Sequence, residues 1–245
     1  MKEAAHIARA VTDVFLERRC PVCGRALRSR EDRLCLHCQC DLPQTLYWVS
    51  TRNAMADRFN ARFTGDELSY YIYAAALFFY RSQAGYAAIP KALKYHADYR
   101  TGRSYARLLG RRLASSEAFR DVDLVVPVPL HPLRRWRRGY NQAEVLAREV
   151  ARELGARLGK GLLRRRRYTR TQTRLHGEAK ARNVAAAFVL TRRARRKGIA
   201  ARHVLILDDV FTTGATLDAC FRALLPLCPF PATRLSVATL AVVKE

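Results

Sequence analysis

The stretch Val204–Thr216, VLILDDVFTTGAT, decides the fold that this sequence predicts. It opens with four apolar residues, Val204 to Leu207, the pattern of a strand buried on both faces of a parallel sheet. Asp208 and Asp209 follow, and we expect the strand to end there because two adjacent carboxylates are unfavourable to bury. A small, hydroxyl-rich loop comes next, and apolar residues recur at helical spacing over 217–224. The stretch predicts a strand, an anion-binding loop and a helix, the unit of an α/β fold.

The loop of this unit has the composition of an anion-binding site. Its residues are small or carry hydroxyl groups, and its backbone N–H groups precede a helix, where a phosphate is favoured. The carboxylates of Asp208 and Asp209 favour vicinal hydroxyl groups or Mg²⁺. An ordinary strand end with a tight turn is the alternative, whereas a nucleotide hydrolase is disfavoured because the sequence has no G-x-x-x-x-G-K-[ST] motif. The loop consists of Thr212, Thr213, Gly214, Ala215 and Thr216.

A second strand, loop and helix unit is predicted earlier in the chain. Residues 124–129, LVVPVP, indicate a strand that ends near Pro127, because proline has no N–H for a central ladder. The loop after it is rich in cations, and residues 143–154 have the spacing of an amphipathic helix. We expect this loop to face the two carboxylates, because ligands bind where the carboxyl ends of parallel strands meet. Its polar residues are His131, Arg134, Arg135, Arg137, Arg138, Tyr140, Asn141 and Gln142.

The composition is strongly basic. The 245 residues carry a formal net charge of +24, and only seven of the 45 basic residues are lysines. Such a charge indicates attraction to polyanions such as nucleic acid, phosphorylated metabolites or an anionic membrane surface. An arginine-rich proteome is the alternative explanation. The densest clusters are Arg164–Arg167, expected in a strand or hairpin, and Arg192–Lys197, expected in a basic turn. For the second cluster, the alternative is a solvated loop without a binding role.

The cellular compartment follows from what the sequence lacks. No stretch has the roughly 18 to 20 apolar residues of a membrane span, and the N-terminus has no apolar core of a signal peptide. We therefore expect a cytoplasmic protein without a membrane span, whose thiols are reduced. In that compartment the seven cysteines are better interpreted as metal ligands than as disulfides.

Two C-x₂-C pairs near the N-terminus are separated by eleven residues, Cys20 with Cys23 and Cys35 with Cys38. Each pair places two thiolates on one side of a turn, and two pairs complete a tetrahedral Zn²⁺ site. With four protein ligands the site would be closed and structural, so we do not expect it to activate water. A nearby histidine or cysteine is close enough in sequence to replace one ligand. These two residues are His37 and Cys40.

The zinc-binding segment and the α/β part are predicted to be separate domains, residues 1–65 and 66–245. Near-helical apolar spacing predicts a short helix in 4–16, and the weak periodicity of 42–62 indicates a linker or a loosely packed connection. The other elements expected are a strand within 70–80 and helices over 88–95 and 105–113.

Seven motifs follow one another along the chain. They are the two C-x₂-C pairs, ALKY (92–95), VPVPLH (126–131), RRGYNQ (137–142), RTQT (170–173), ARNVAAAF (181–188) and LDDVFTTGAT (207–216). Their order resembles that of the competence protein F (ComF-like) phosphoribosyltransferases, over nearly the whole chain and least at 42–68. The resemblance implies a type I phosphoribosyltransferase fold, a central mostly parallel sheet flanked by helices, preceded by a small zinc-ribbon domain. It also implies an association with competence and DNA uptake.

The resemblance further implies a ligand, 5-phosphoribosyl-1-pyrophosphate with Mg²⁺, whose phosphoribosyl group is transferred to an unidentified acceptor. Asp208 and Asp209 would orient the ribose hydroxyls, and Thr212 to Thr216 would hold the 5′-phosphate. The cations expected at the leaving pyrophosphate are Arg138, Lys94 and Arg135. The other residues implied in ligand binding are Val128, Pro129, Asn141, Gln142, Val210 and Phe211. Further candidates, as a closing flap or as structural hydrogen-bond partners, are Arg170, Gln172, Arg182 and Asn183.

Two departures from related enzymes narrow the expected chemistry. Thr212 stands where hypoxanthine-guanine enzymes carry an acid, so their proposed general base is missing. Lys2 follows Met1, where a glutamine-dependent amidotransferase exposes a catalytic cysteine. Neither that purine chemistry nor glutamine hydrolysis is therefore expected.

Two alternatives to an enzyme stay open. The first is a single-stranded DNA-binding accessory factor of natural transformation, in which the phosphoribosyl pocket is regulatory or vestigial. The basic clusters favour it, as do Tyr140 and Tyr168, which are able to stack on bases. The second is a structural protein that docks onto a partner protein through the zinc ribbon.

Overall fold

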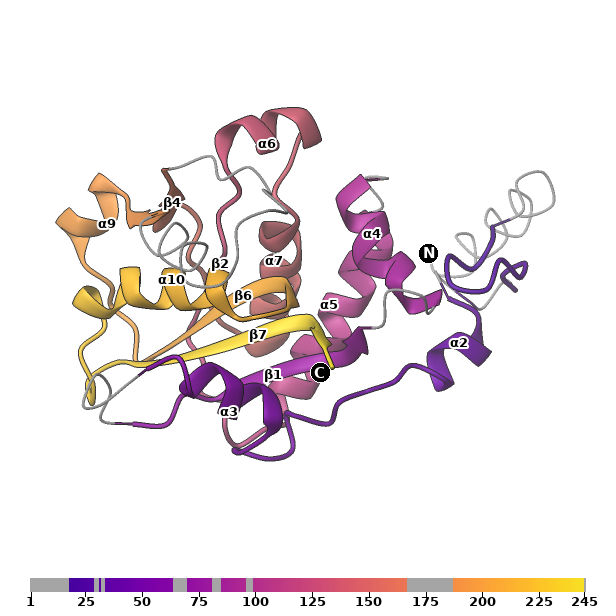
Figure 1. Ribbon diagram of the computed structural model, residues 1–245, viewed down its shortest axis with the longest axis horizontal. Coiled ribbons are helices and arrows are strands. Elements are labelled where there is room, and N and C mark those ends of the chain that lie inside the picture. The colour runs from indigo at the N-terminus through magenta and orange to yellow at the C-terminus, as the bar shows by residue number, and fades with distance from the viewer. Residues whose placement is uncertain are drawn as a thin grey trace.

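The computed structural model of the chain describes residues 18–28, 31, 34–63, 70–80, 85–95, 99–166 and 187–244. Within these ranges, five strands form one parallel sheet in the order β1-β7-β6-β2-β3 (Figure 1). The strands are β1 (Ala74–Tyr80), β2 (Leu124–Pro127), β3 (Arg157–Leu158), β6 (His203–Phe211) and β7 (Arg234–Val243). The predicted α/β class and its parallel central sheet are confirmed.

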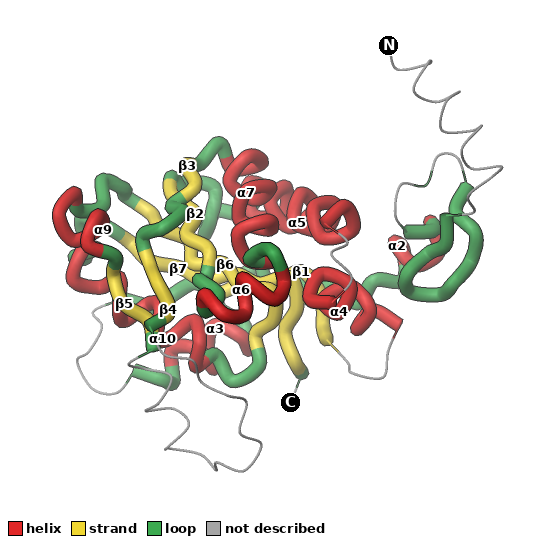
Figure 2. Tube along the Cα trace, turned by 90° about the horizontal axis from the view of Figure 1, so that it is seen from above, coloured by secondary structure: helices red, strands yellow, loops and turns green. Residues whose placement is uncertain are grey.

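Helices cover both faces of this sheet (Figure 2). They are α3 (Ala54–Asn60), α4 (Ala88–Tyr95), α5 (Tyr99–Ala114), α7 (Gln142–Leu154) and α10 (Ala215–Leu224). Along β6, Leu205 and Leu207 pack into an apolar cluster with α4, α5 and α7, while Val204 and Ile206 pack into a second cluster with α3 and α10. Both faces of the strand are therefore buried, which explains why this run has no polar alternation.

β6 is longer than predicted. The two aspartates predict the end of the strand at their position, but the strand continues to Phe211 because β7 pairs with it that far. β2 stops earlier, at the pair formed by Pro127 and Leu207. Asp208 and Asp209 therefore lie inside β6 but beyond the end of its other neighbour, where the edge of the sheet opens. β7 itself was not predicted.

Two basic segments expected to be a loop and a turn are short helices. α6 spans Pro132–Arg138; the His131 side chain caps its first turn, and Gly139 ends it with a φ of 76°. α9 spans Arg192–Lys197 and begins at Thr191, whose hydroxyl accepts a hydrogen bond from its first turn. Capping residues delimit both helices, and their sequences contain no apolar periodicity that would predict a helix.

The segment expected to be a linker contains a helix that belongs to the core. α3 begins at Asn53, whose side chain accepts a hydrogen bond of 2.9 Å from the N–H of Ala56. The fully buried ring of Phe59 packs against Phe211 and Phe221, with centroid distances of 6.4 and 5.8 Å. The helix has only seven residues, too few to build a visible periodic pattern. The domain boundary near residue 65 stays a prediction.

The remaining expected elements fall partly outside the described residues. The strand within 70–80 is β1, and the helices of 88–95 and 105–113 are α4 and α5. The basic cluster that starts at Arg164 enters an antiparallel pair of strands, β4 (Leu163–Arg165) and β5 (Phe188–Leu190). The helix expected in 4–16 lies outside the part of the chain that the structure describes. Within that part, no helix combines the length and the apolar character required to cross a bilayer.

The cysteine-rich segment packs against the main domain. Cys35 and Cys38, at the start and within the short helix α2 (Leu36–Cys40), share an apolar cluster with Tyr105 of α5. The hydroxyl of Tyr86, in the 3₁₀ turn η2 (Gly85–Ala87), donates a hydrogen bond of 2.6 Å to the carboxylate of Asp41. The two parts of the chain are therefore joined by a common core as well as by a polar contact.

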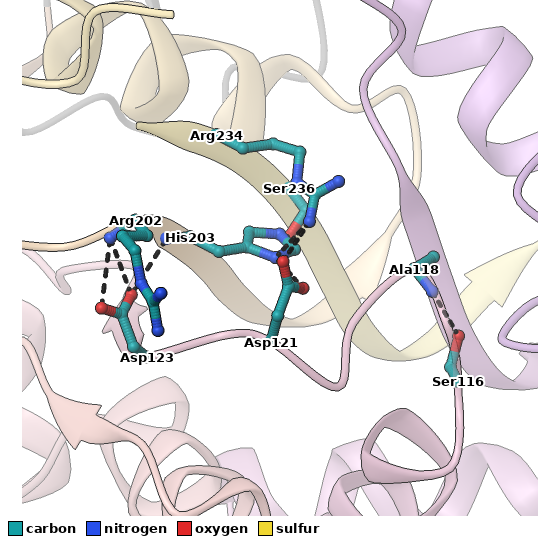
Figure 3. A network of polar contacts seen from close by, with 8 residues as sticks. All are labelled: Ser116, Ala118, Asp121, Asp123, Arg202, His203, Arg234 and Ser236. Carbon is teal, nitrogen blue, oxygen red and sulfur yellow. Dashed lines mark hydrogen bonds and ion pairs between the residues drawn. The ribbon is translucent and has the colours of Figure 1, made fainter. Parts of the chain in front are cut away.

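A buried polar network joins the first residues of β6 and β7 to the loop before β2 (Figure 3). The fully buried ring of His203 lies 2.8 Å from Asp121 through Nδ1 and 2.8 Å from the hydroxyl of Ser236 through Nε2. The carboxylate favours a proton on Nδ1, so Nε2 accepts from the serine. Arg234 pairs with the same carboxylate, and Asp123 accepts backbone N–H groups at the start of β6. Because Ser236 has no exposed surface, the network is structural and not a catalytic triad.

We expect this network to lower the free energy of unfolding as the pH falls. Burial lowers the pKa of His203 below its ordinary value of 6.5, although Asp121 opposes the shift. Below pH 6.5 the unfolded chain therefore binds a proton that the folded chain excludes, and stability is lost. Urea unfolding from about pH 8 to about pH 5 should show this loss, at most about 1.4 kcal/mol per pH unit. His203→Gln should flatten the pH dependence, and an unchanged slope would contradict this account.

Candidate functional site

A cavity of about 770 Å³ opens beside the carboxyl ends of β6 and β2. It is bounded by β6, the loop after β2, α6, the start of α7 and β4, with contributions from the ends of β1, α4 and α10. The structure thus brings the two predicted strand, loop and helix units to one space. The lining residues are Tyr80, Pro90, Val128, Pro129, Leu130, Arg134, Arg138, Asn141, Gln142, Arg165, Asp208, Asp209, Val210, Thr212 and Thr216.

The acidic side of the cavity is formed by β6. Asp208 is half-buried and Asp209 is 5% exposed. The backbone N–H of Asp209 donates a hydrogen bond of 2.8 Å to the carboxylate of Asp208, which restrains the orientation of that carboxylate. Both residues line the cavity, which opens beside β6 where β2 has already ended, and one carboxylate oxygen of Asp209 is buried. Carboxylates in such a place can accept hydrogen bonds from hydroxyl groups or coordinate Mg²⁺.

The basic side is formed by α6 and β4. Arg134 and Arg138 reach the cavity from α6, and Arg138 donates a hydrogen bond of 3.3 Å to the side chain of Gln142. Arg165 reaches it from β4, with its guanidinium 5.2 Å from the ring centroid of Phe188. Burial and then the cation of Arg134 lower the pKa of Arg165. Guanidinium groups gathered in this way favour an anionic ligand.

Asn141 supports the cavity wall rather than offering its whole side chain to a ligand. Its Nδ2 donates a hydrogen bond of 2.9 Å to the carbonyl of Val128, and its Oδ1 accepts one of 3.2 Å from the N–H of Ala143 at the start of α7. The side chain therefore caps the helix and holds the loop after β2 at the same time. The backbone of Val128 and Pro129 is positioned by this contact.

The small, hydroxyl-rich segment predicted to be a loop, 212–216, forms the turn after β6 and the first two residues of α10, because α10 already begins at Ala215. Thr212 and Thr216 line the cavity, and Gly214 has a φ of 76°, a left-handed conformation that glycine adopts without strain. A Cβ at Gly214 would stand 2.9 Å from the ring of Phe211, so only glycine fits there. The loop delivers the chain directly into α10, whose N-terminal N–H groups favour an anion.

Several predicted site residues do not line the 770 Å³ cavity. Phe211, Gly214 and Ala215 border a smaller one of about 20 Å³ at the same loop. The Arg135 side chain lies 4.0 Å from Glu144. Lys94 belongs to α4, but its side chain is outside the described part of the structure, and Thr213 is exposed beside the cavity. The candidates that fall outside the described residues are Tyr168, Arg170, Gln172, Arg182 and Asn183.

Other lining residues were not predicted as ligand-binding positions. Arg134 and Arg165 belong to basic clusters that the sequence reveals, but nothing in their spacing shows which arginines face inward. Tyr80 is the last residue of the strand expected in 70–80. Its place at the carboxyl end of a parallel strand is the feature that could have predicted it as a lining residue, because ligands bind at those ends. Pro90 and Leu130 carry no such signal, because they reach the cavity only through the packing of α4 and of the loop after β2.

The four predicted cysteine ligands are brought together at the N-terminal part of the chain. The Sγ atoms of Cys20, Cys23, Cys35 and Cys38 all lie within 4.8 Å of one another, and neither His37 nor Cys40 belongs to the group. Burial raises the pKa of Cys20, but hydrogen bonds from backbone N–H groups outweigh it and lower that pKa to about 7. Cys20 therefore favours the thiolate, the form that binds metal, whereas burial raises the pKa of Cys38. The cluster can hold a structural metal ion.

Comparison with known proteins finds relatives named for competence and for DNA utilization. Competence protein F of Haemophilus influenzae is 33% identical over 128 residues, which are 51% of this chain and 55% of that protein. DNA utilization protein YhgH of Escherichia coli K12 is 37% identical over 103 residues, 42% of this chain and 43% of that protein. YhgH of Salmonella typhimurium is 37% identical over 118 residues, 48% of each chain.

These matches have a limited extent. The chain spans about half the length of the curated relatives it matches, and no family model matches it. The names of these relatives nevertheless point to the same family as the order of motifs along the sequence. The parallel α/β sheet that follows a cluster of four cysteines agrees with the fold expected for that family. Together these findings support the assignment of this chain to the competence protein F-like family.

Proposed function

We propose that the protein binds 5-phosphoribosyl-1-pyrophosphate with Mg²⁺ in the large cavity and transfers the phosphoribosyl group to an acceptor. The observation that carries the proposal is that one cavity holds a carboxylate pair, a hydroxyl-rich loop at a helix N-terminus and three arginines. These groups match the ribose hydroxyls, the 5′-phosphate and the pyrophosphate of that ligand in kind.

In the proposed reaction, a lone pair of the acceptor forms a bond to C1 of the ribose while the bond from C1 to pyrophosphate breaks. The electron pair leaves with pyrophosphate, and the acceptor releases a proton to water. Arg138 stabilises the leaving charge, with Lys94 and Arg135 as further proposed cations. Asp208 and Asp209 orient the ribose and would hold Mg²⁺, which supplies charge neutralisation when bound. The loop 212–216 anchors the 5′-phosphate and so fixes C1.

A second candidate function is binding of single-stranded DNA, with the phosphoribosyl pocket regulatory or vestigial. Two relatives are named for competence and for DNA utilization. The observation that favours this role is α6, which stands out from the body (Figure 1) and exposes 83% of Trp136 and 56% of Leu133 beside Arg137. Bases stack on such aromatic and cationic groups. Tyr140 fits stacking less well, because its hydroxyl donates to the carbonyl of Leu93.

The four-cysteine cluster is proposed to hold Zn²⁺. Four sulfur ligands without an open position are typical of structural zinc sites. Thiols that hold a metal must stay reduced, which supports a cytoplasmic protein involved in competence or DNA uptake. A partner protein docking on the ribbon is compatible with Leu36, which is 65% exposed at its surface.

Ligand binding is tested by titration calorimetry with 5-phosphoribosyl-1-pyrophosphate and Mg²⁺. The wild type should bind saturably, and Asp208→Ala and Asp209→Ala should each weaken binding about tenfold or more, because each removes charged hydrogen-bond acceptors. Glu117→Ala, which removes an exposed carboxylate away from the cavity, is the matched control. Absence of saturable binding by the wild type would refute the proposal. Pyrophosphate release on adding candidate acceptors then measures turnover.

The metal site is tested by zinc content and thermal unfolding. The purified protein should contain one equivalent of zinc, and chelation should lower Tm because the metal holds the cysteines of a shared core. Cys35→Ser should lose the metal, while Cys40→Ser, which alters an exposed cysteine outside the cluster, should keep it. Equal loss of zinc from both variants would contradict this ligand set.

The DNA-binding alternative is tested by the salt dependence of binding to an oligo-dT strand. Log affinity should fall with log salt by about 0.7 for each phosphate contacted. Trp136→Ala should weaken binding by about 1–3 kcal/mol if a base stacks there. Val49→Ala, at a side chain that is 75% exposed elsewhere on the surface, should leave it unchanged. Binding that does not respond to salt would rule out this mode.

A further inference from the structure

Helix α3 lies beside the loop that is proposed to hold the 5′-phosphate, and it contacts that loop through two arginines. The guanidinium of Arg58 donates hydrogen bonds of 2.7 Å to the carbonyl of Thr212 and of 2.9 Å to the carbonyl of Val243, at the end of β7. Arg62, just after α3, donates one of 2.9 Å to the carbonyl of Thr213. Two consecutive carbonyl groups of the loop are therefore held by one short segment far away in sequence.

These contacts determine where the loop directs its N–H groups. In a trans peptide the C=O and the following N–H point in opposite directions. Because the carbonyls of Thr212 and Thr213 point to α3, the N–H groups of Thr213 and Gly214 point away from it. The loop segment 212–216 borders the large cavity through Thr212 and Thr216. The ring of Phe211, 2.9 Å from where a Cβ of Gly214 would stand, supports the loop from another direction.

The arginines are themselves held in fixed positions. The guanidinium of Arg62 lies 3.0 Å from the carboxylate of Asp218, which is 9% exposed. Arg222 binds the other oxygen of this carboxylate at 2.7 Å and donates a hydrogen bond of 3.0 Å to the carbonyl of Arg62. Arg58 lies over the ring of Phe211, 5.2 Å from its centroid. A planar guanidinium can satisfy several such partners at once, whereas an ammonium group cannot.

α3 is also fastened to the sheet, so the arginines have a rigid base. The side chain of Asn60 exchanges two hydrogen bonds of 2.9 Å with the backbone of Ile72, just before β1. Asn53 donates one of 2.9 Å to the carbonyl of Ala74, the first residue of β1. Together with the buried ring of Phe59, these contacts leave α3 little freedom to shift relative to the loop.

We propose that Arg58 and Arg62 are positioning residues of the anion-binding loop, which hold its carbonyls and thereby direct its N–H groups toward the phosphate. The identity of the ligand rests on the proposed function, but the bracing of the loop does not. The segment that precedes the main sheet thus becomes part of the binding site without touching the ligand.

The test compares Arg58→Met and Arg62→Met with Arg52→Met. Arg52 belongs to the same segment but lies over the ring of Tyr71, 5.1 Å from its centroid. Calorimetry uses two probes, ribose 5-phosphate and pyrophosphate. We expect Arg58→Met and Arg62→Met each to weaken ribose 5-phosphate binding about tenfold, since each removes charged hydrogen bonds to the loop. Pyrophosphate affinity should stay at the wild-type value, which a general folding defect would not allow. Arg58→Lys, which keeps the charge but has a single nitrogen in place of the two that reach the carbonyls of Thr212 and Val243, should bind with intermediate affinity.

A second measurement does not depend on any ligand. Hydrogen–deuterium exchange of residues 210–217 should become faster in Arg58→Met and Arg62→Met and stay unchanged in Arg52→Met. Unchanged exchange in the first two variants would overturn the proposal, as would wild-type ribose 5-phosphate affinity in them. If the wild type binds neither probe while exchange responds as expected, the proposed function fails and the bracing of the loop stands.

Discussion

The parallel ladder between β6 and β7 is the interaction on which the rest of the structure depends. It continues to Phe211, whereas the ladder between β6 and β2 stops at Leu207. The unequal lengths leave the last part of β6 paired on one side only, and there the two aspartates meet the cavity. β7 pairs with only part of this backbone, and the N–H of Asp209 donates instead to the carboxylate of Asp208. The same extension carries the chain to the loop and α10, and brings the loop within reach of α3.

Arginine serves different purposes in different parts of this basic chain. The fully buried Glu149 of α7 accepts contacts from Arg103, Arg107 and Arg152 at 2.6, 3.1 and 3.3 Å. Burying a carboxylate is unfavourable unless cations compensate it, so these arginines stabilise the contact between α5 and α7. Arg58 and Arg62 hold backbone carbonyls. The net charge of +24 is therefore not a direct measure of an anion-binding surface, since part of it maintains the fold.

The cysteine cluster and the main domain are energetically connected. Burial and then the nearby Cys20 and Cys38 raise the pKa of Tyr105, which lies on α5. The same apolar cluster includes Ile89 and Leu93 of α4. α4 also carries Pro90 into the cavity, so this helix packs in the same cluster as the cysteines and lines the candidate site.

The sequence by itself determined the central unit and the chemistry that surrounds it. An uninterrupted apolar run, two acids and a small loop have few other interpretations, and two C-x₂-C pairs specify their own geometry, because both patterns are local. The order of the strands, the presence of β7 and the true end of β6 were decided by pairing between distant segments. So was the role of α3, whose seven residues contain no periodic signal and whose arginines look like any others. Their function depends on which carbonyls the tertiary structure places in front of them, and spacing along the chain does not encode that.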